Sequence, residues 1–432
     1  MSVIPLNAES PIDQWLAAIE ACHPAEIDLG LDRMREVAQR LPIDIEKSLK
    51  VVVGGTNGKG TSIRLLESIL IQAGYSVGTY TSPHFLYYNE RITLQGNPVS
   101  DVIICNAFYQ IEQARQAVPL TYFEYGTLAA LLIFSEALPD VLLLEVGLGG
   151  RLDSVNLVDA DISLVTTVAL DHTDWLGPDR EAIGYEKAGI FRPNCPAVCG
   201  DPDAPVSLIQ HAEKIGAYLL RNQVDYDYQL TENTTWSWQG RSLNGDKVTK
   251  TALPIPKLPL QNAAAILQVL ELLPVTVSDQ QLAYGLVRAQ LTGRMQRAQV
   301  AGLPCLLDVA HNPESAAYLA NYLAKHLGSK VHLVLGMLID KDIQQVCQLL
   351  APVVDHWHLV SLSTPRGASS AQLRDVILAL GEDVSSITEY DSVKIALSEL
   401  PDTLESSTHL VIAGSFFTVT DALPLVERVD GE

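Results

Sequence analysis

The chain of 432 residues is longer than one hydrophobic core usually supports, so we expect two or three domains. Its formal charge of −22 argues against proteins that bind nucleic acids or anionic membranes, because both need clustered Lys and Arg. The N-terminal residues lack the pattern of a secretory signal, and no stretch reaches about 18 uninterrupted apolar residues. Six cysteines are too few for a disulfide framework. We therefore expect a soluble cytoplasmic protein.

Short, continuous apolar runs in the first half of the chain predict buried parallel strands. These runs cover residues 49–55, 76–82, 141–147 and 162–170. Between them, the amphipathic segment 62–75 and the apolar segment 125–138 predict helices. Strands that alternate with helices are typical of a parallel sheet covered on both faces. Cys195 and Cys199 flank a further short run, so we favour structural thiols over metal ligands.

The pattern changes between residues 222 and 256, where polar residues alternate with aromatic or β-branched ones. Together with an Asn244–Gly245 turn, this alternation predicts a small antiparallel hairpin or meander appended to the main sheet. Helices are predicted after it, at 260–273 and near 278–290. The sequence therefore places a small β element beside the first α/β series.

A second α/β series begins beyond residue 295. Apolar runs predict strands at 304–310, 331–338, 357–362 and 409–417, separated by helices such as 314–327 and 342–354. We place a domain junction near 290–298. The expected architecture is a larger α/β domain followed by a smaller Rossmann-like domain, with a cleft between them.

The stretch from Val51 to Ser62, VVVGGTNGKGTS, resembles a phosphate-binding loop but departs from the usual pattern. Val53 stands where the first glycine of that pattern is expected, and the hydroxyl comes one place late, at Thr61. A glycine-rich turn between a strand and a helix directs backbone N–H groups at phosphate, and Lys59 adds a cation. We prefer nucleotide binding to the alternative of a glycine-rich connection with a solvated lysine.

Polar side chains at neighbouring strand ends predict a Mg²⁺ site beside this loop. Ser82 ends the run at 76–82, Glu145 lies within the apolar run VLLLEVG, and Asp171–His172 follows the run at 162–170. A carboxylate in an apolar strand needs a partner, and the alternative for Glu145 is a capped structural group. From the residues alone, His172 fits a hydrogen-bonded loop residue as well as a metal ligand.

Nine motifs in order carry a family resemblance: GGTNGKGTS, TSPH, EVGLGGRLDSVN, TTVALDHTDWLG, EKAGI, LQNAAAI, GRMQ, DVAHNP and GSFFTV. Together they resemble the folylpolyglutamate synthase family, and more narrowly its bacterial members that are also dihydrofolate synthases. This family is related to the Mur peptidoglycan ligases. The resemblance implies an α/β fold in which residues 1–290 form a P-loop, Mur-ligase-like ATPase domain with a parallel-rich sheet. It also implies a smaller Rossmann-like C-terminal domain at 291–432.

The resemblance implies roles for the nucleotide-site residues. ATP phosphates are expected at Thr56, Asn57, Gly58, Lys59, Gly60 and Thr61. Mg²⁺ is expected at Ser82, Glu145 and His172. Lys187 matches a lysine that is carbamylated in related enzymes, with an ordinary ion-paired lysine as the alternative, and a monovalent cation is a further expected cofactor.

Residues further along the chain match nucleotide or amine contacts of the family. Asn262 and Arg294 match nucleotide-contacting residues, and Arg294 is expected to reach the γ-phosphate when the domains close. Asp308 and His311 match residues that contact ATP or the incoming amine. A helix cap by Asp308 or Asn312 ahead of Pro313 is the structural alternative.

The resemblance also implies a pterin site with two walls. One wall is Asp28, Leu29 and Gly30. The second wall is Thr121, Tyr122, Phe123 and Glu124, and Leu152 is a further expected substrate-binding residue. Core packing ahead of a helix is the alternative for the segment at 121–124, and the residues alone favour it.

The activity implied is ATP-dependent ligation of L-glutamate to dihydropteroate and to reduced folates through an acyl phosphate. The expected catalytic residues are Lys59, Glu145, His172, Lys187, Arg294, Asp308 and His311. Small-molecule substrates, no nucleic acid, no membrane and a monomer are expected. The alternatives are a dedicated folylpolyglutamate synthase, another Mur-type ligase, a noncatalytic ATP-binding regulator and a P-loop kinase. The late hydroxyl at Thr61 disfavours the kinase.

Overall fold

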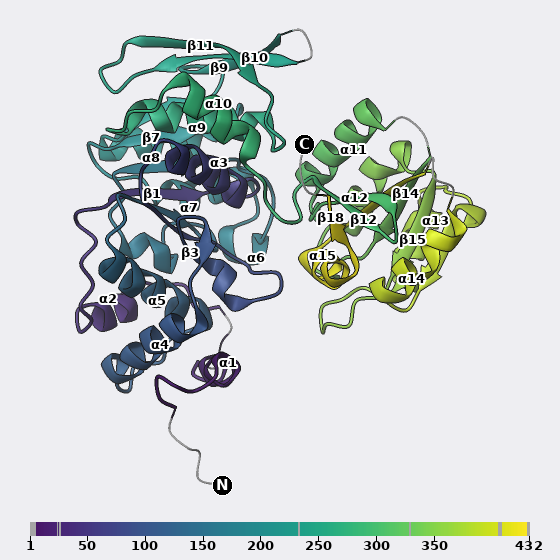
Figure 1. Ribbon diagram of the computed structural model, residues 1–432, viewed down its shortest axis with the longest axis horizontal. Coiled ribbons are helices and arrows are strands. Elements are labelled where there is room, and N and C mark those ends of the chain that lie inside the picture. The colour runs from purple at the N-terminus through teal and green to yellow at the C-terminus, as the bar shows by residue number, and fades with distance from the viewer. Residues whose placement is uncertain are drawn as a thin grey trace. The chain divides into compact units, whose positions relative to one another are not determined.

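A computed structural model describes residues 6–23, 25, 27–231, 234–327, 330–404 and 408–429 of the chain. The chain divides into two compact units, Met1–Ala289 and Gln290–Glu432. Each unit has its own sheet and its own helices (Figure 1). Within the described residues, no helix is long and apolar enough to cross a membrane.

The sheet of the first unit is mainly parallel. Its described strands, in the order β4-β3-β2-β5-β1-β6-β7-β8, form an eight-stranded sheet in which β3 pairs antiparallel with both β2 and β4 and the other neighbours are parallel. The strands are β1 (Leu49–Gly54), β2 (Val77–Tyr80), β3 (Ile92–Leu94), β4 (Asn97–Pro98), β5 (Val141–Glu145), β6 (Ile162–Val165), β7 (Pro196–Cys199) and β8 (Tyr218–Arg221). The runs predicted at 49–55, 76–82, 141–147 and 162–170 are confirmed as strands, although β2 and β6 end earlier than expected.

Helices cover both faces of this sheet. One face packs against α3 (Lys59–Gln72) and α9 (Leu260–Leu272), and α10 (Asp279–Arg288) packs on α3. The apolar residues of the opposite face share one core with α4, α5, α7 and α8. The remaining bounds are α1 (Ile12–Glu20), α2 (Asp32–Ala38), η1 (Tyr88–Arg91), α4 (Asp101–Arg115), α5 (Tyr122–Ala137), η2 (Ser154–Leu157), α6 (Thr173–Leu176), α7 (Arg180–Ala188) and α8 (Val206–Ile215).

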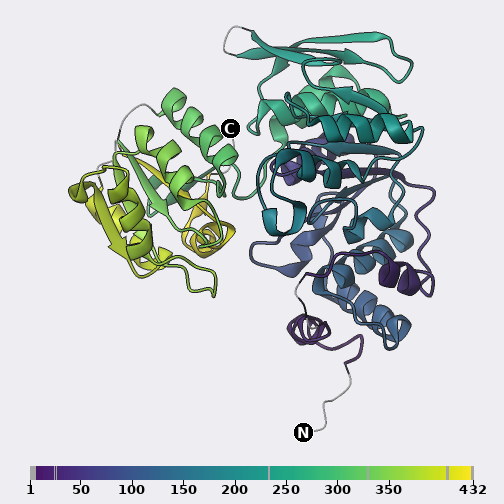
Figure 2. The same cartoon turned by 180° about the vertical axis from the view of Figure 1, so that it is seen from behind.

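The β element predicted at 222–256 is present, but it is not part of the main sheet. The strands β9 (Asp227–Thr231), β10 (Thr235–Arg241) and β11 (Lys247–Pro254) form a separate three-stranded sheet, with Gly245 in the turn at a φ of +83°. This sheet packs on α9 and α10, beyond them from the main sheet (Figures 1 and 2). Trp238 of β10 is buried and donates to the Ala264 carbonyl at 3.0 Å. Packing against a helix therefore replaces pairing with the main sheet.

The second unit has a seven-stranded sheet in the order β16-β15-β14-β17-β13-β12-β18, parallel except at β12 and β18. An apolar core joins one face of it to α11, α12 and α13, while α14 and α15 contact β15, β16 and β17. The strands are β12 (Gln296–Val300), β13 (Leu303–Leu307), β14 (Val331–Leu335), β15 (His356–Val360), β16 (Ile387–Tyr390), β17 (His409–Ala413) and β18 (Glu427–Arg428). The helices are α11 (Pro313–His326), α12 (Ile343–Leu350), η3 (Ala351–Val353), α13 (Ser370–Ala379), η4 (Val384–Ser386), α14 (Val393–Thr403), α15 (Phe416–Ala422) and η5 (Leu423–Leu425).

Three histidines lie side by side on β14 and β15 of this sheet. The rings of His332 and His356 stack with centroids 5.2 Å apart, and His332 Nδ1 lies 2.9 Å from Nε2 of His358. Tyr390 Oη and Thr388 Oγ1 approach the same rings, at 3.4 Å from His358 Nδ1 and 2.9 Å from His356 Nε2. Burial lowers the pKa of all three histidines, that of His358 to about 3.

Acid should loosen this part of the second unit. Because His358 stays neutral in the folded chain, the unfolded chain alone takes up its proton below about pH 6.5. The free energy of opening therefore falls as the pH drops below that value, by about 2 kcal/mol at pH 5 for a histidine that stays neutral. Amide hydrogen exchange of β15, compared at pH 7 and pH 5 after correction for intrinsic rates, measures this loss.

His358→Gln should flatten the pH dependence of exchange in β15, because the replacement side chain takes up no proton. His326→Gln, at an exposed position near the end of α11, is the matched control and should leave the dependence as in the parent protein. Equal pH dependence in the parent and in His358→Gln would contradict the assignment.

Candidate nucleotide and acceptor site

The phosphate-binding loop connects β1 to α3, as its glycines predict. Gly58 precedes α3 with a φ of +84°, and no side chain caps that helix. A Cβ atom on Gly58 would lie 2.3 Å from the Asn262 amide nitrogen, and one on Gly55 would lie 1.8 Å from Thr166 Oγ1. Glycine is therefore required at both positions by close neighbours as well as by backbone conformation.

Lys59 opens α3, and its side chain folds back over the loop. Its Nζ donates to the carbonyl oxygens of Gly55 and Thr56 at 2.9 and 3.2 Å. The ammonium is also close enough to Asp153 to lower its pKa, although burial acts more strongly and raises that pKa to about 6. The fully buried Asp153 accepts from the backbone N–H groups of Leu148 and Val155, each at 2.9 Å. Sequence reasoning did not single out Asp153, although it lies within the motif EVGLGGRLDSVN.

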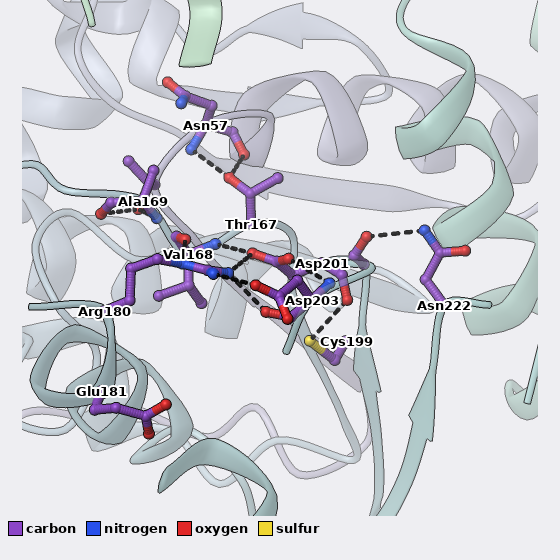
Figure 3. A network of polar contacts seen from close by, with 12 residues as sticks. Asn57, Thr167, Val168, Ala169, Arg180, Glu181, Cys199, Asp201, Asp203 and Asn222 are labelled. Carbon is purple, nitrogen blue, oxygen red and sulfur yellow. Dashed lines mark hydrogen bonds and ion pairs between the residues drawn. The ribbon is translucent and has the colours of Figure 1, made fainter. Parts of the chain in front are cut away.

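The segment that follows β6 lies along the phosphate-binding loop (Figure 3). Thr56 N–H donates to the Thr167 carbonyl at 2.8 Å, and Asn57 N–H donates to Thr167 Oγ1 at 3.1 Å. Ala169 N–H donates to Thr56 Oγ1 at 3.0 Å. The strand predicted over 162–170 ends at Val165 because the following residues bond to this loop in place of neighbouring strands.

Two of the three predicted metal ligands lie together at the ends of β2 and β5. Ser82 N–H donates to a carboxylate oxygen of Glu145 at 3.1 Å, and the Glu145 side chain is buried. β2 ends at Tyr80, so Ser82 lies two residues beyond the strand that it was predicted to end. A buried carboxylate and a nearby hydroxyl are oxygen ligands that suit Mg²⁺.

His172 lies in the segment that is bonded to the phosphate-binding loop. It is exposed, has a φ of +53° and immediately precedes α6, and its N–H donates to the Asp171 carboxylate at 2.9 Å. Among the described residues, no group of three His, Cys, Asp or Glu side chains could hold a metal ion by itself. Mg²⁺ usually retains several waters and binds substrate phosphates, so one carboxylate fits its coordination habits.

Asn262 and Lys187 are both buried in the first unit. The Asn262 amide donates to Ser62 Oγ at 3.1 Å and to the Gly58 carbonyl at 3.3 Å. These bonds tie α9 to the first turn of α3. Lys187 lies in the last turn of α7, and its carbamylation stays a prediction.

The two predicted pterin walls are joined by Arg33. Its Nη1 lies 2.6 Å from the Asp28 carboxylate, and its Nε donates to Glu124 at 2.9 Å. Gly30 N–H donates to the Leu152 carbonyl at 3.2 Å, which brings Leu152 to the first wall. Glu26, in the same stretch, lies outside the described residues. Sequence reasoning did not single out Arg33, and the only available signal was its place in the stretch AEIDLGLDR.

In the segment at 121–124, two residues cap α5 and the other two present aromatic rings near the ends of β2 and β5. Thr121 and Glu124 form a capping box at the start of α5, and both side chains are buried, which agrees with the alternative of packing ahead of a helix. The half-buried ring of Phe123 lies 5.9 Å from that of Tyr80 and against Gly147, where a Cβ atom would meet it at 2.5 Å. The half-buried ring of Tyr122 meets that of Tyr88 edge-on at 5.7 Å. An aromatic surface of this kind suits a flat heteroaromatic ligand.

Comparisons with known proteins give the family. Residues 293–416 match the family described as Mur ligase, glutamate ligase domain. The dihydrofolate synthase/folylpolyglutamate synthase of Escherichia coli is 42% identical over 98% of this chain and 97% of that protein. The protein of the same name from Haemophilus influenzae is 39% identical over 99% of this chain and 100% of its own. The chain belongs to the dihydrofolate synthase/folylpolyglutamate synthase family.

Solved structures of this family confirm the predicted fold class. Escherichia coli FolC in complex with DHPP and ADP has a TM-score of 0.91 at 42% identity, covering 98% of each chain. The Yersinia pestis bifunctional enzyme has a TM-score of 0.89 at 43% identity, covering 98% of this chain and 99% of that one. A further relative at 42% identity, with a TM-score of 0.89 over 97% of this chain and 98% of its own, was solved with Mn, AMPPNP and L-glutamate bound. Nucleotide and divalent-metal binding are thus established in this family.

Three further predicted site residues, Arg294, Asp308 and His311, lie in the second unit of this chain, within the matched residues 293–416. Buried Asp308 accepts from Met295 and Ala310 N–H groups, each at 2.9 Å, and burial raises its pKa while Arg294 opposes the shift. The Arg294 guanidinium lies 5.2 Å from the Phe416 ring centroid. His311 Nδ1 lies 2.9 Å from the Val309 carbonyl oxygen.

The helix cap ahead of Pro313 is made by Asn312. Its side chain accepts from Ser315 N–H at 3.0 Å, which confirms one of the two caps that the sequence allowed. Asp308 instead accepts from Met295 and Ala310, within its own loop and the start of β12. Asp308 is therefore held by backbone groups at the end of β13 and does not cap α11.

Glu145→Gln should weaken the dependence of nucleotide binding on Mg²⁺. The amide keeps the shape of the side chain but removes the charge, so the apparent affinity for Mg²⁺ should fall about tenfold or more. Titration of Mg²⁺ at fixed ADP, followed by calorimetry, measures the change. Glu67→Gln, which alters another buried carboxylate paired with Arg64, is the matched control. An unchanged Mg²⁺ titration in Glu145→Gln would remove Glu145 from the metal site.

Proposed function

We propose that the protein uses ATP and Mg²⁺ to ligate L-glutamate to dihydropteroate, forming dihydrofolate, and to reduced folates, extending them to polyglutamates. The observation that carries the proposal is the convergence of two sites in the first unit. The loop with Lys59 and the Ser82–Glu145 pair lies at the strand ends. The predicted acceptor site, whose two walls Arg33 joins, lies beside the same strand ends. Its Phe123 ring is close to Tyr80 at the end of β2 and to Gly147 just beyond β5.

A carboxylate is a poor electrophile because its oxygen is a poor leaving group. In the proposed reaction, a carboxylate oxygen of the acceptor attacks the γ-phosphorus, ADP leaves and an acyl phosphate forms. The amine of L-glutamate then attacks the acyl carbon, phosphate leaves and the amine loses a proton. Bound Mg²⁺ supplies neutralisation of phosphate charge.

The residues of the first unit contribute positioning and charge to both steps. Backbone N–H groups of the glycine-rich loop and the Lys59 ammonium hold the phosphates. The Glu145 carboxylate and the Ser82 hydroxyl hold the cation. The Phe123 ring and the Asp28–Gly30 segment orient the pterin so that the acceptor carboxylate faces the γ-phosphate.

Several finer assignments remain predictions within this proposal. They are Mg²⁺ binding by His172, a carbamate on Lys187, nucleotide or amine contacts of Asn262, Arg294, Asp308 and His311, and activation by a monovalent cation. A monomeric state and a cytoplasmic location are also part of the proposal. Hydrogen bonds of the Asn262 amide to Gly58 and Ser62 support an indirect role for this residue, through the start of α3.

Release of ADP in the presence of ATP, Mg²⁺ and L-glutamate tests the proposed function, with dihydropteroate and tetrahydrofolate compared as acceptors. Turnover with both acceptors is expected. Turnover with tetrahydrofolate alone would indicate a dedicated folylpolyglutamate synthase and would remove the pterin role of Asp28–Gly30. Failure with both acceptors would overturn the proposal.

Lys59→Ala should reduce turnover about a hundredfold or more without unfolding the protein, because a cation at the phosphates is lost. Lys214→Ala, which removes an exposed lysine of α8, is the control and should leave turnover unchanged. ADP release is measured beside the thermal unfolding of each variant. Normal turnover in a folded Lys59→Ala protein would contradict the role of Lys59.

Arg33→Ala should raise the KM for dihydropteroate about tenfold while leaving the KM for ATP unchanged, because it removes the charged link between the two pterin walls. Arg35→Ala is the matched control on the same helix, since Arg35 is more exposed and pairs with Asp32 at 3.3 Å. Steady-state kinetics with each substrate varied in turn separate the two constants. A rise in both KM values to the same extent would indicate a general loss of structure.

A further inference from the structure

The backbone of Val168 is held from the side opposite the phosphate-binding loop by two charged side chains. Asp201 accepts from Val168 N–H at 2.7 Å, and Arg180 Nε donates to the Val168 carbonyl at 2.8 Å (Figure 3). Both hydrogen-bonding groups of this residue are thereby satisfied by side chains from other elements. A pair of side chains thus occupies the place that a neighbouring strand would have in a longer β6.

Arg180 is fixed in turn by the loop that follows β7. Its Nη1 lies 2.5 Å from the Asp203 carboxylate, and its Nη2 donates to the Asp203 carbonyl at 2.6 Å. Nη2 also lies 3.2 Å from the carboxylate of Asp201, and Asp201 itself is buried. The planar guanidinium is well suited to bind several oxygens in one orientation, which a lysine cannot reproduce.

The residues on either side of Val168 bind the phosphate-binding loop. Thr167 accepts from the N–H groups of Thr56 and Asn57, and Ala169 donates to Thr56 Oγ1. The segment from Thr167 to Ala169 therefore lies between this loop and the Arg180–Asp201 pair. A displacement of Val168 would therefore displace the phosphate-binding loop that its neighbours bind. It would also displace His172, which lies three residues beyond Ala169.

We propose that Arg180 and Asp201 are positioning residues for nucleotide binding, acting through Val168 on the phosphate-binding loop and on the segment that carries His172. The inference rests on the proposed ATP-dependent function. The two residues act on the backbone of the segment and hold it where the loop N–H groups converge on phosphate. Loss of either should weaken nucleotide binding and leave binding of the acceptor unchanged.

The same geometry separates this role from a purely structural one. The side chain of Arg180 is 37% exposed and that of Asp203 is 87% exposed, so water can reach the bonds between these two residues. Exposed ion pairs of this kind contribute little to the stability of a fold. The expected effect is therefore on the affinity for nucleotide, with a small effect on thermal unfolding.

Arg180→Ala should raise the Kd for ADP with Mg²⁺ about tenfold, as expected when a charged hydrogen bond to the segment is lost. The KM for ATP should rise in parallel, and the KM for dihydropteroate should stay unchanged. Calorimetric titration of the full chain with ADP at saturating Mg²⁺ measures the affinity. Arg180→Lys should give an intermediate rise, and it serves as the decisive variant if Arg180→Ala does not fold.

Glu181→Ala is the matched control, because Glu181 is the next residue of α7 and binds elsewhere. Its carboxylate accepts from Ser207 and Val206 N–H groups, at 2.7 and 3.1 Å, and in Figure 3 it points away from the network. Its Kd for ADP should equal that of the parent protein. An increase in Kd as large as that of Arg180→Ala would overturn the inference by showing a general effect of α7.

A double variant provides a second test. If Arg180 and Asp201 act through the same residue, Arg180→Ala and Asp201→Asn should each raise the Kd, and together they should raise it by less than the product of the two effects. Unchanged affinity in both single variants would overturn the inference. Failure of the parent protein to bind ADP would instead overturn the proposed function, so the two outcomes are distinguishable.

Discussion

A loop with four glycines between residues 54 and 60 has little conformational preference of its own, so its shape must come from its neighbours. The hydrogen bonds between Thr56 or Asn57 and the Thr167–Ala169 segment supply that shape. These bonds also explain why β6 ends at Val165 and why the following residues turn toward the loop. The position of the predicted phosphate-binding groups therefore depends on this pairing of two segments that are about a hundred residues apart in the chain.

The local patterns predicted most of the strands and the loop between β1 and α3, because a buried parallel strand and a glycine-rich turn are specified by consecutive residues. Contacts between distant side chains leave no such pattern. Arg33 reaches Glu124 across 91 positions, and Arg180 reaches Asp203 across 23, so neither could be read from periodicity. The β element at 222–256 was misplaced for a related reason. An alternating pattern predicts pairing between its own strands, but it does not say which surface covers their buried tryptophans.

The start of α5 combines a structural role with a predicted role in acceptor binding. Thr121 and Glu124 cap the helix, and the same Glu124 carboxylate binds Arg33, which holds Asp28. Because the cap holds the Glu124 carboxylate at the helix end, the ion pairs of Arg33 link the Asp28–Gly30 segment to the start of α5. The predicted acceptor site therefore depends on a helix cap, and a helix cap is a feature that residues close together in the sequence specify.

A chain with a formal charge of −22 repels anions at long range, yet the proposed substrates are anionic. Local groups must therefore outweigh the net field, and they act over distances shorter than the Debye length of about 8 Å at physiological ionic strength. Backbone N–H groups and the Lys59 ammonium are the groups proposed to hold the phosphates, and the glycines of the loop add no bulk around them. Asp153 lies near Lys59 and partly offsets its charge, although burial raises the pKa of Asp153 to about 6 and its carboxylate accepts backbone hydrogen bonds. Placement of a few groups, more than overall charge, determines what this site binds.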